Sequence, residues 1–217
     1  MITLNDVPGS RILWVGAHPD DELFLAPLLG ALSEERTIGF VVATRGQRGP
    51  CYRPEGCEPD LATVREEEMR NAAALFGGTV EFADCPDLSA PDDPEGVLRN
   101  WNIDRIREAI DRFNPDLIFT FDPHHGGRDH ADHRAAGLVI ERLRPSVPVW
   151  RNATRVHWGE QPPAFSATRP DAIGFDAGDD WHYLIGDLKC HRSQMRPETL
   201  DWFANVPVDA RTVWVLR

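Results

Sequence analysis

Short apolar runs alternate with longer amphipathic stretches along the first two thirds of the chain. The apolar runs are bounded by polar or turn residues and contain many β-branched and aromatic side chains, a pattern that predicts buried strands. We expect strands over Arg11–Gly16, Thr37–Thr44, Thr79–Ala83 and Asp116–Phe121. Near-continuous hydrophobic runs of this kind are typical of a parallel sheet that is covered on both faces.

The stretches between these runs carry apolar residues at helical spacing. We expect helices over Asp20–Glu35, Asp60–Phe76, Asn102–Phe113 and Ala131–Leu143. Gly77-Gly78 is a stop signal at the end of the second helix. Because parallel strands need right-handed crossovers, the helices must cover both faces of the sheet. The sequence therefore predicts a three-layer, Rossmann-like α/β fold with a mainly parallel sheet.

The pattern is weaker beyond Pro145. We expect short strands at Pro148–Arg151 and Ala172–Phe175, a helix over Asp179–Met195 and a last strand at Thr212–Leu216. The length suits one substantial core. We expect a single α/β domain over residues 1–217, in which residues from about 145 to 217 form a smaller C-terminal lobe on the same sheet.

Composition and charge exclude several classes of protein. The chain has 217 residues, with 35 Asp and Glu against 23 Lys and Arg, and a formal net charge of -12. This balance argues against a nucleic-acid partner, which is bound by clustered basic residues. No apolar run reaches the roughly 18 residues of a transmembrane segment, and the N-terminus lacks the pattern of a secretory signal. We expect a cytoplasmic protein. The sequence does not determine its oligomeric state, and a homo-oligomer is one possibility.

A Gly- and Pro-rich loop over residues 45–59 separates the second strand from the second helix. Cys51 and Cys57 in this loop have no adjacent metal ligands, so we interpret them as free thiols or a facultative pair. The loop also contains three arginines: Arg45, Arg48 and Arg53. They favour contact with an anionic part of a substrate, unless they pair with neighbouring carboxylates.

Two histidine-bearing segments directly follow predicted strands. The first is Ala17–Glu22, and the second, residues 122–133, holds four of the eight histidines together with three aspartates. Helix capping explains the acidic residues of the first segment, but not a histidine three residues before Asp21. Ligands of open α/β sheets bind at the carboxyl ends of the strands, so the two segments should meet. Histidine and carboxylate are the ligand set of catalytic zinc, which predicts a divalent metal site.

These residues, in this order, resemble the PIG-L/LmbE family of zinc-dependent N-acetylglucosamine deacetylases. The resemblance rests on AHPDDE at 17–22, RxxE at Arg65–Glu68 and HxDH at His130–His133, and His191–Gln194 also fits. It covers roughly Arg11 to Gln194. It implies one Zn²⁺ ion per chain, or another divalent metal, and a small-molecule N-acetyl amino sugar as the substrate.

The resemblance also implies roles for the first motif and for the last histidine of HxDH. His18, Asp21 and His133 would bind the metal, and Asp20 would be the general base that takes a proton from the attacking water. Zinc lowers the pKa of water to about 7 and polarises a carbonyl, as amide hydrolysis requires. Two adjacent aspartates can divide the work, because only the one on the metal is neutralised.

The remaining roles concern the substrate. His130 would face the oxyanion as a cation or a hydrogen-bond donor, with Asp132 holding its ring, and Arg65 would position the substrate carbonyl or the leaving acetate. Many relatives carry a tyrosine where this chain has Arg128. A guanidinium there could bind an oxyanion or an anionic substrate group, although a solvated loop arginine is the alternative.

The sequence thus predicts a metal-dependent hydrolase that removes an acetyl group from an N-acetylated amino sugar. One alternative is an amidase that cleaves a larger acyl or thiol-glycoside conjugate, and another is a non-catalytic metal-binding α/β module. A nucleotide-binding module is disfavoured, because residues 11–21 lack GxGxxG and their carboxylates would repel a pyrophosphate.

Overall fold

The computed structural model describes residues 1–88, 93–125, 130–157 and 160–217. In these residues a seven-stranded sheet has the order β3-β2-β1-β4-β5-β9-β8. Its strands are β1 (Arg11–Gly16), β2 (Thr37–Val42), β3 (Thr79–Phe82), β4 (Leu117–Phe121), β5 (Val149–Asn152), β8 (Ile173–Asp176) and β9 (Thr212–Leu216). The first five strands are parallel, β9 pairs with β5 in the antiparallel direction, and β8 pairs antiparallel to β9. The predicted mainly parallel α/β fold is confirmed.

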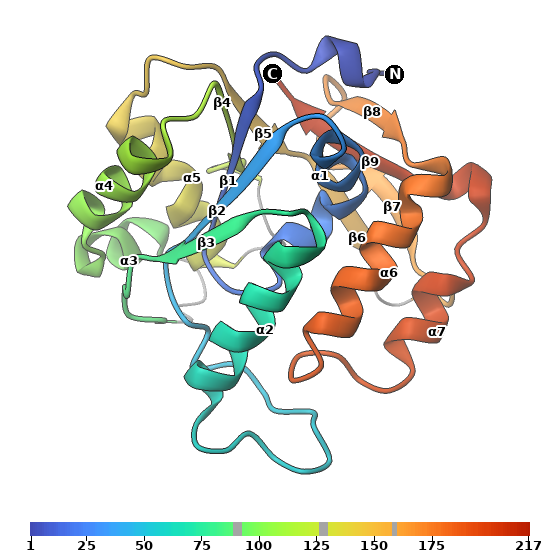
Figure 1. Ribbon diagram of the computed structural model, residues 1–217, viewed down its shortest axis with the longest axis horizontal. Helices are drawn as coiled ribbons and strands as arrows, with labels where there is room; N and C mark the ends of the chain where they lie inside the picture. The colour runs from blue at the N-terminus through green and yellow to red at the C-terminus, as the bar shows by residue number, and fades with distance from the viewer. Residues whose placement is uncertain (89–92, 126–129, 158–159) are drawn as a thin grey trace.

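Helices cover both faces of this sheet (Figure 1). One face carries α1 (Ala26–Ser33), α2 (Leu61–Leu75) and α6 (Trp181–Cys190), and α6 contacts the other two. The other face carries α3 (Pro94–Asn100), α4 (Ile103–Phe113) and α5 (Ala131–Leu143). A short helix, α7 (Thr199–Ala204), contacts α6. The three-layer arrangement agrees with the prediction.

Local signals fix where the helices begin and end. The carboxylate of Asp60 accepts the N–H of Thr63 at 2.9 Å and caps α2. The chain leaves α4 at Asn114, whose φ of 52° lies in the left-handed region that asparagine tolerates. The buried side chains form one cluster that includes residues of β1 and of the C-terminal part, such as Trp14, Trp181 and Val215.

The structure differs from the prediction in four places, one of which is the helix expected over Asp179–Met195, since α6 spans only Trp181–Cys190. The helix expected over Asp20–Glu35 is divided into a 3₁₀ turn over Asp21–Phe24 and α1, because Asp20 has a φ of 97° and Pro27 suits only the first turn of a helix. Helices α3 and α7 were not expected. Nor was the antiparallel pair of β6 (Thr154–His157) and β7 (Ala164–Ala167), which forms a sheet of its own.

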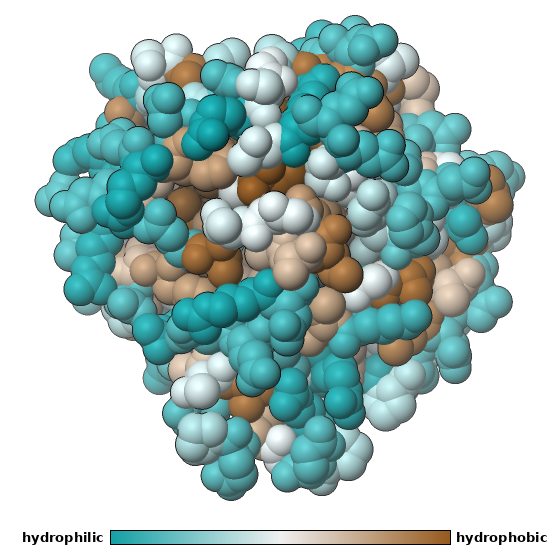
Figure 2. Space-filling model, viewed as in Figure 1, coloured by the Kyte–Doolittle hydropathy of each residue, from teal (hydrophilic) through white to brown (hydrophobic). Residues whose placement is uncertain are grey.

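The surface is mostly polar, as the composition predicts. Figure 2 shows hydrophilic residues over most of one face, with hydrophobic residues in small separate groups. Among the described residues the large hydrophobic side chains that are exposed are those of Met1, Leu75 and Val208. No helix in this part of the chain is both long and apolar enough to span a membrane.

Candidate metal centre

The predicted site residues gather at a cavity of about 560 Å³, at the carboxyl ends of β1, β2 and β4. The lining includes His18, Asp20, Asp21, Arg65, His130 and His133. Asp132 is fully buried in the first turn of α5. Arg128 lies outside the described residues, so its role as a substrate contact stays a prediction. The two histidine-bearing segments therefore meet at one edge of the sheet.

The turn after β1 holds the carboxylate of Asp21 in a fixed orientation. Its Oδ2 accepts the backbone N–H groups of Ala17 at 2.7 Å and of His18 at 2.8 Å, which leaves Oδ1 facing the cavity. Burial alone would raise the pKa of Asp21, but the nearby His133 and His18 outweigh it and hold this pKa well below its usual range. Asp21 is thus a pre-oriented, ionised oxygen donor.

Three donor atoms converge as a small metal ion requires. Oδ1 of Asp21 lies 2.9 Å from Nε2 of His133 and 3.8 Å from Nδ1 of His18. Ligands of a tetrahedral zinc ion, each about 2.1 Å from the metal, lie roughly 3.4 Å apart. Ring nitrogens of His18, His130 and His133 also lie within 4.8 Å of one another. The donor set therefore fits a zinc-type ion, with His130 as a further nitrogen beside it.

The far side of the His18 ring is supported by a buried carboxylate. Nε2 of His18 lies 3.1 Å from Oδ2 of Asp132. A carboxylate on the second nitrogen of a metal-binding histidine fixes its tautomer and orientation, which leaves Nδ1 for the metal. We expected Asp132 to hold the ring of His130, which stays a prediction, and the structure shows its carboxylate beside the ring of His18.

A second carboxylate near His18 was missed in the sequence. Oδ1 of Asp87 lies 3.7 Å from Nε2 of His18, and Oδ2 accepts the backbone N–H of Arg48 at 2.8 Å. Asp87 follows β3 closely, so its position after a strand could have identified it. Asp87 is far from His18 in sequence, so nothing in the sequence indicated that the two side chains are in contact.

His130 packs at the cavity surface against the two histidines that we expect to bind the metal, His18 and His133. Its ring centroid lies 4.5 Å from that of His133, in a stacked arrangement, and 4.9 Å from that of His18, edge to face. Burial, and then the charges of His133 and His18, lower the pKa of His130 to about 4. Of the two roles expected for this residue, the environment favours the neutral hydrogen-bond donor over the cation.

Arg65 is buried beneath the cavity and binds Asp20. Its Nη2 lies 3.0 Å from Oδ1 of Asp20 and also donates to the carbonyl of Pro19, and Nη1 donates to the carbonyl of Gly46 at 2.8 Å. Gly46 is required there, because its φ is 63° and a Cβ would lie 2.2 Å from Nη1 of Arg65. The structure therefore shows Arg65 orienting Asp20, and its expected role in substrate binding stays a prediction.

Glu68, the last residue of the RxxE motif, binds the segment His191–Gln194 that also fits the family pattern. The carboxylate of Glu68 accepts the backbone N–H of Ser193 at 2.8 Å and its hydroxyl at 2.6 Å. Arg53 donates to the same carboxylate at 2.7 Å. Helix α2 and the end of the C-terminal segment are thus joined directly below the cavity.

The arginine-rich loop is largely neutralised by carboxylates. Nη1 of Arg45 lies 2.7 Å from Glu66 and its Nε donates to Asp84 at 2.9 Å. With Arg53 bound to Glu68, two of the three arginines pair with carboxylates. Their partners differ from the neighbouring acidic residues that the sequence suggested, Glu55, Glu58, Asp60 and Asp129, the last of which lies outside the described residues. The exposed Arg48 donates to the backbone carbonyl of Leu88 at 2.9 Å.

The two loop cysteines form a disulfide. Cys51 and Cys57 are bonded, which is the pair that the sequence left open beside free thiols. Disulfides persist mainly in oxidising compartments. This bond therefore gives no support to the cytoplasmic location expected from the sequence, which stays a prediction.

A family profile described as "PIG-L: GlcNAc-PI de-N-acetylase" matches residues 13–143. The chain is 29% identical, over 81% of its own length and 72% of the relative's, to a 1D-myo-inositol 2-acetamido-2-deoxy-alpha-D-glucopyranoside deacetylase of Nakamurella multipartita. Seven further curated relatives are 26–30% identical, and the chain spans only 41–61% of their length.

Solved structures of low sequence identity share the fold. An N,N'-diacetylchitobiose deacetylase from Pyrococcus horikoshii superposes with a TM-score of 0.66 at 19% identity, over 88% of this chain and 73% of that one. A 4-carboxy-2-hydroxymuconate hydratase from Pseudomonas putida superposes with a TM-score of 0.63 at 20% identity, over 89% and 82% of the two chains. Because a deacetylase and a hydratase share this architecture, the chemistry must be argued from the site itself.

Proposed function

The chain belongs to the PIG-L family of GlcNAc-PI de-N-acetylases, and from that premise we propose that it is a metal-dependent hydrolase that removes the acetyl group of an N-acetylated amino sugar. The observation that carries this proposal is the convergence of His18 Nδ1, Asp21 Oδ1 and His133 Nε2 beside the carboxylate of Asp20. The named deacetylases among the relatives support the same chemistry.

We assign the metal to His18, Asp21 and His133, and we propose zinc as the ion. When bound, such an ion polarises the amide carbonyl and lowers the pKa of water. The protein's contribution is to hold the three donors in place before the ion arrives. Two backbone N–H groups fix Asp21, and Asp132 fixes the ring of His18.

Asp20 is the general base in this proposal. Its side chain is 23% exposed and lines the cavity, whereas that of Asp21 is almost completely buried. Arg65 holds one oxygen of Asp20 at 3.0 Å, which leaves the other to accept a proton from the water that attacks the amide. A buried guanidinium that orients this carboxylate is consistent with catalysis.

His130 is placed to act on the other side of the reacting carbonyl. It lines the cavity and stacks on His133, so a neutral ring can donate a hydrogen bond to the oxygen that gains negative charge. A donor of this type typically contributes about 3–4 kcal/mol to transition-state stabilisation. The proton that Asp20 receives can then pass to the departing amine, which leaves as the amino sugar.

The experiment that tests this proposal is a direct assay of amine and acetate release. The protein with its bound metal is incubated with methyl N-acetylglucosaminide and with N-acetylglucosaminyl inositol, and both products are quantified. We expect equal amounts of amine and acetate, and at least about a hundredfold slower release with the Asp20→Asn variant. If the metal-loaded protein releases neither product from either substrate, the proposed activity is wrong.

A further inference from the structure

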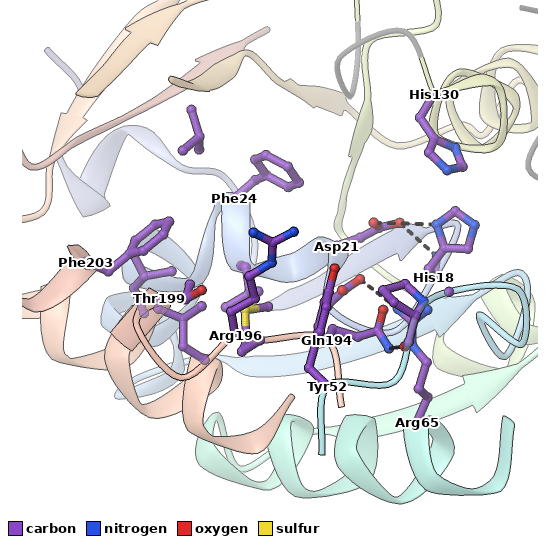
Figure 3. Close-up of a pocket in the computed structure, with 18 of the residues that line it drawn as sticks. His18, Asp21, Phe24, Tyr52, Arg65, His130, Gln194, Arg196, Thr199 and Phe203 are labelled. Carbon is purple, nitrogen blue, oxygen red and sulfur yellow. Dashed lines mark hydrogen bonds and ion pairs between the residues drawn. The ribbon is translucent and has the colours of Figure 1, made fainter. Parts of the chain in front are cut away.

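The cavity extends well beyond the metal-binding residues. Figure 3 shows His18, Asp21 and His130 on one side, and Phe24, Thr199 and Phe203 across the cavity from them. The second half is lined by hydrophobic side chains, chiefly Leu23, Phe24, Val156, Phe165, Leu184 and Phe203. We call these six residues the apolar wall. An N-acetyl group needs only the metal-binding half.

The apolar wall is built by elements that pack firmly on one another. Phe165 of β7 contacts Trp181 of α6 edge to face, with centroids 5.0 Å apart, and it contacts Phe203 of α7 at 5.9 Å. Nε1 of Trp181 donates to the carbonyl of Phe203 at 3.0 Å. These contacts join the unexpected hairpin and the unexpected helix to α6. The space they enclose is therefore preformed.

The apolar wall begins directly beside the metal centre. The ring of Phe24 lies 6.5 Å from that of His133 and 5.9 Å from that of Phe121, which stacks on His133 at 4.4 Å. Phe24 follows the metal-binding turn, because it ends the 3₁₀ helix that starts at Asp21. A group attached to the reacting amide or to its sugar can thus reach the wall without leaving the cavity.

The charged residues at this cavity lie at its rim or at the metal. The side chain of Arg196 is exposed, and its guanidinium carbon lies 5.5 Å from the centre of the Tyr52 ring. Figure 3 places Arg196 between the two halves of the cavity. Hydroxyl groups of a second sugar would lose their hydrogen bonds against phenyl and aliphatic side chains, which opposes their binding there. An apolar group loses nothing and releases water.

We infer that the apolar wall is a subsite for an apolar substituent of the substrate, an alkyl or aryl group. This inference rests on the proposed function and adds the substrate class to it. The substituent has two sources, the acyl chain of the amide or the aglycone of the sugar. Both extend from atoms near the reacting carbonyl, and both would bury methylene or aromatic surface against the wall.

Two series of substrates distinguish these sources. In one, methyl glucosaminide carries an N-acetyl, N-butanoyl or N-hexanoyl group, and in the other, N-acetylglucosaminide carries a methyl, butyl or hexyl aglycone. Each buried methylene is expected to raise kcat/KM by about fourfold. A rise along the first series assigns the wall to the acyl chain, and a rise along the second assigns it to the aglycone. Constant kcat/KM along both series would overturn the inference.

A pair of matched variants tests the wall itself. Val156→Phe adds a ring to the apolar half, and Val208→Phe makes the same change on an exposed turn. Val156→Phe should reduce the preference for the longer member of the responding series by about tenfold, and Val208→Phe should not change it. An unchanged preference in a correctly folded Val156→Phe variant would contradict the assignment, and circular dichroism checks the fold.

Binding measurements separate failure of this inference from failure of the proposed function. The ligands are titrated calorimetrically into the Asp20→Asn variant. They are methyl and hexyl glucosaminide with a free amine, and the N-hexanoyl derivative of each. We expect at least about tenfold tighter binding of a ligand with the six-carbon group, with a negative change in heat capacity. Tight binding without any hydrolysis by wild type would reject only the proposed activity. Equal affinities alongside acetate release would reject only the apolar subsite.

Discussion

Nε2 of His191 lies 2.5 Å from Oε1 of Glu22, and both side chains are completely buried. This ion pair joins residues 169 positions apart, from the first motif and from the C-terminal segment. Burial alone would lower the pKa of His191, but Glu22 and Asp187 outweigh it and hold this pKa well above its usual value. Because Glu22 directly follows Asp21, the pair anchors the turn that carries the proposed base and one metal ligand.

We predict that removing either partner of this pair is strongly destabilising. Glu22→Gln and His191→Gln should each lower the free energy of unfolding by about 3–5 kcal/mol, because each breaks a buried ion pair. Asp187, 3.5 Å from Nε2 of His191, remains in the first variant. The double variant should lose less than the sum of the two. Urea unfolding with a chelator present measures these values without a contribution from metal.

The exposed ion pair of Asp104 and Arg107 serves as the control for this cycle. Asp104→Asn should cost less than about 1 kcal/mol. Strict additivity of the two buried substitutions would show that Glu22 and His191 do not stabilise one another.

The two adjacent aspartates should respond in opposite ways to the same substitution. Asp20→Asn should keep the metal and lose about 10²–10⁴-fold in kcat, because an amide cannot accept the proton of water. Asparagine tolerates the left-handed backbone of Asp20, whose φ is 97°. Asp21→Asn should lose the metal, because a neutral amide replaces an ionised ligand. Metal content and kcat, measured on both variants, decide the assignment, and the reverse pattern would exchange the two roles.

We expect the metal to stabilise the folded protein, since the unfolded chain has no assembled site. A chelator should lower Tm and abolish activity, and Zn²⁺ should restore both. His133→Ala should purify without metal and show no change in Tm on chelation. His182→Ala, which removes an exposed histidine, should retain about one ion per chain. Activity of the metal-free protein equal to that of the loaded one would contradict the metal centre.

Particular residues show how far the sequence determines the fold and the site. Thr212–Leu216 and Ala131–Leu143 have the predicted bounds, because long or strongly apolar segments carry their own signal. Helix α7 and the β6–β7 hairpin are too short to show a clear hydrophobic pattern in the sequence. Their side chains are buried by contacts between the two elements, such as that of Phe165 with Phe203. These elements supply half of the residues of the apolar wall, so no pattern in the sequence indicated that part of the cavity.

Long-range partners limited the prediction of the site in the same way. The segments that hold His18, Asp21 and His133 could be placed at one edge because both follow parallel strands. Glu22 had an adequate local explanation as an acidic residue at a helix start, and nothing near it in the sequence indicated His191. Asp132 lies two residues from His130 in sequence, yet its carboxylate contacts the ring of His18 in the turn that follows β1.

The start of β1 offers a test of pH dependence at a distance from the metal centre. Oδ2 of Asp116 accepts the backbone N–H groups of Ser10 at 2.8 Å and of Arg11 at 2.9 Å, and the Ser10 hydroxyl at 3.1 Å. These hydrogen bonds, that from the Ser10 backbone first, lower the pKa of Asp116. A carboxyl group whose pKa is lower in the folded state stabilises the fold above its unfolded pKa, and this stabilisation is lost as the pH falls through the folded pKa.

Asp116→Asn should therefore be less stable than wild type at pH 7. The difference should shrink as the pH falls below about 4, because the carboxylate of the unfolded chain then takes up a proton before that of the folded protein does. The amide keeps the shape of the side chain, so the comparison isolates the charge. Asp209→Asn, on the exposed turn over Val208–Ala210, is the matched control and should follow wild type throughout. Urea unfolding at several pH values between 7 and 3 measures the difference directly. A difference that stayed constant or grew toward acid would mean that the three hydrogen bonds do not favour the ionised form of Asp116.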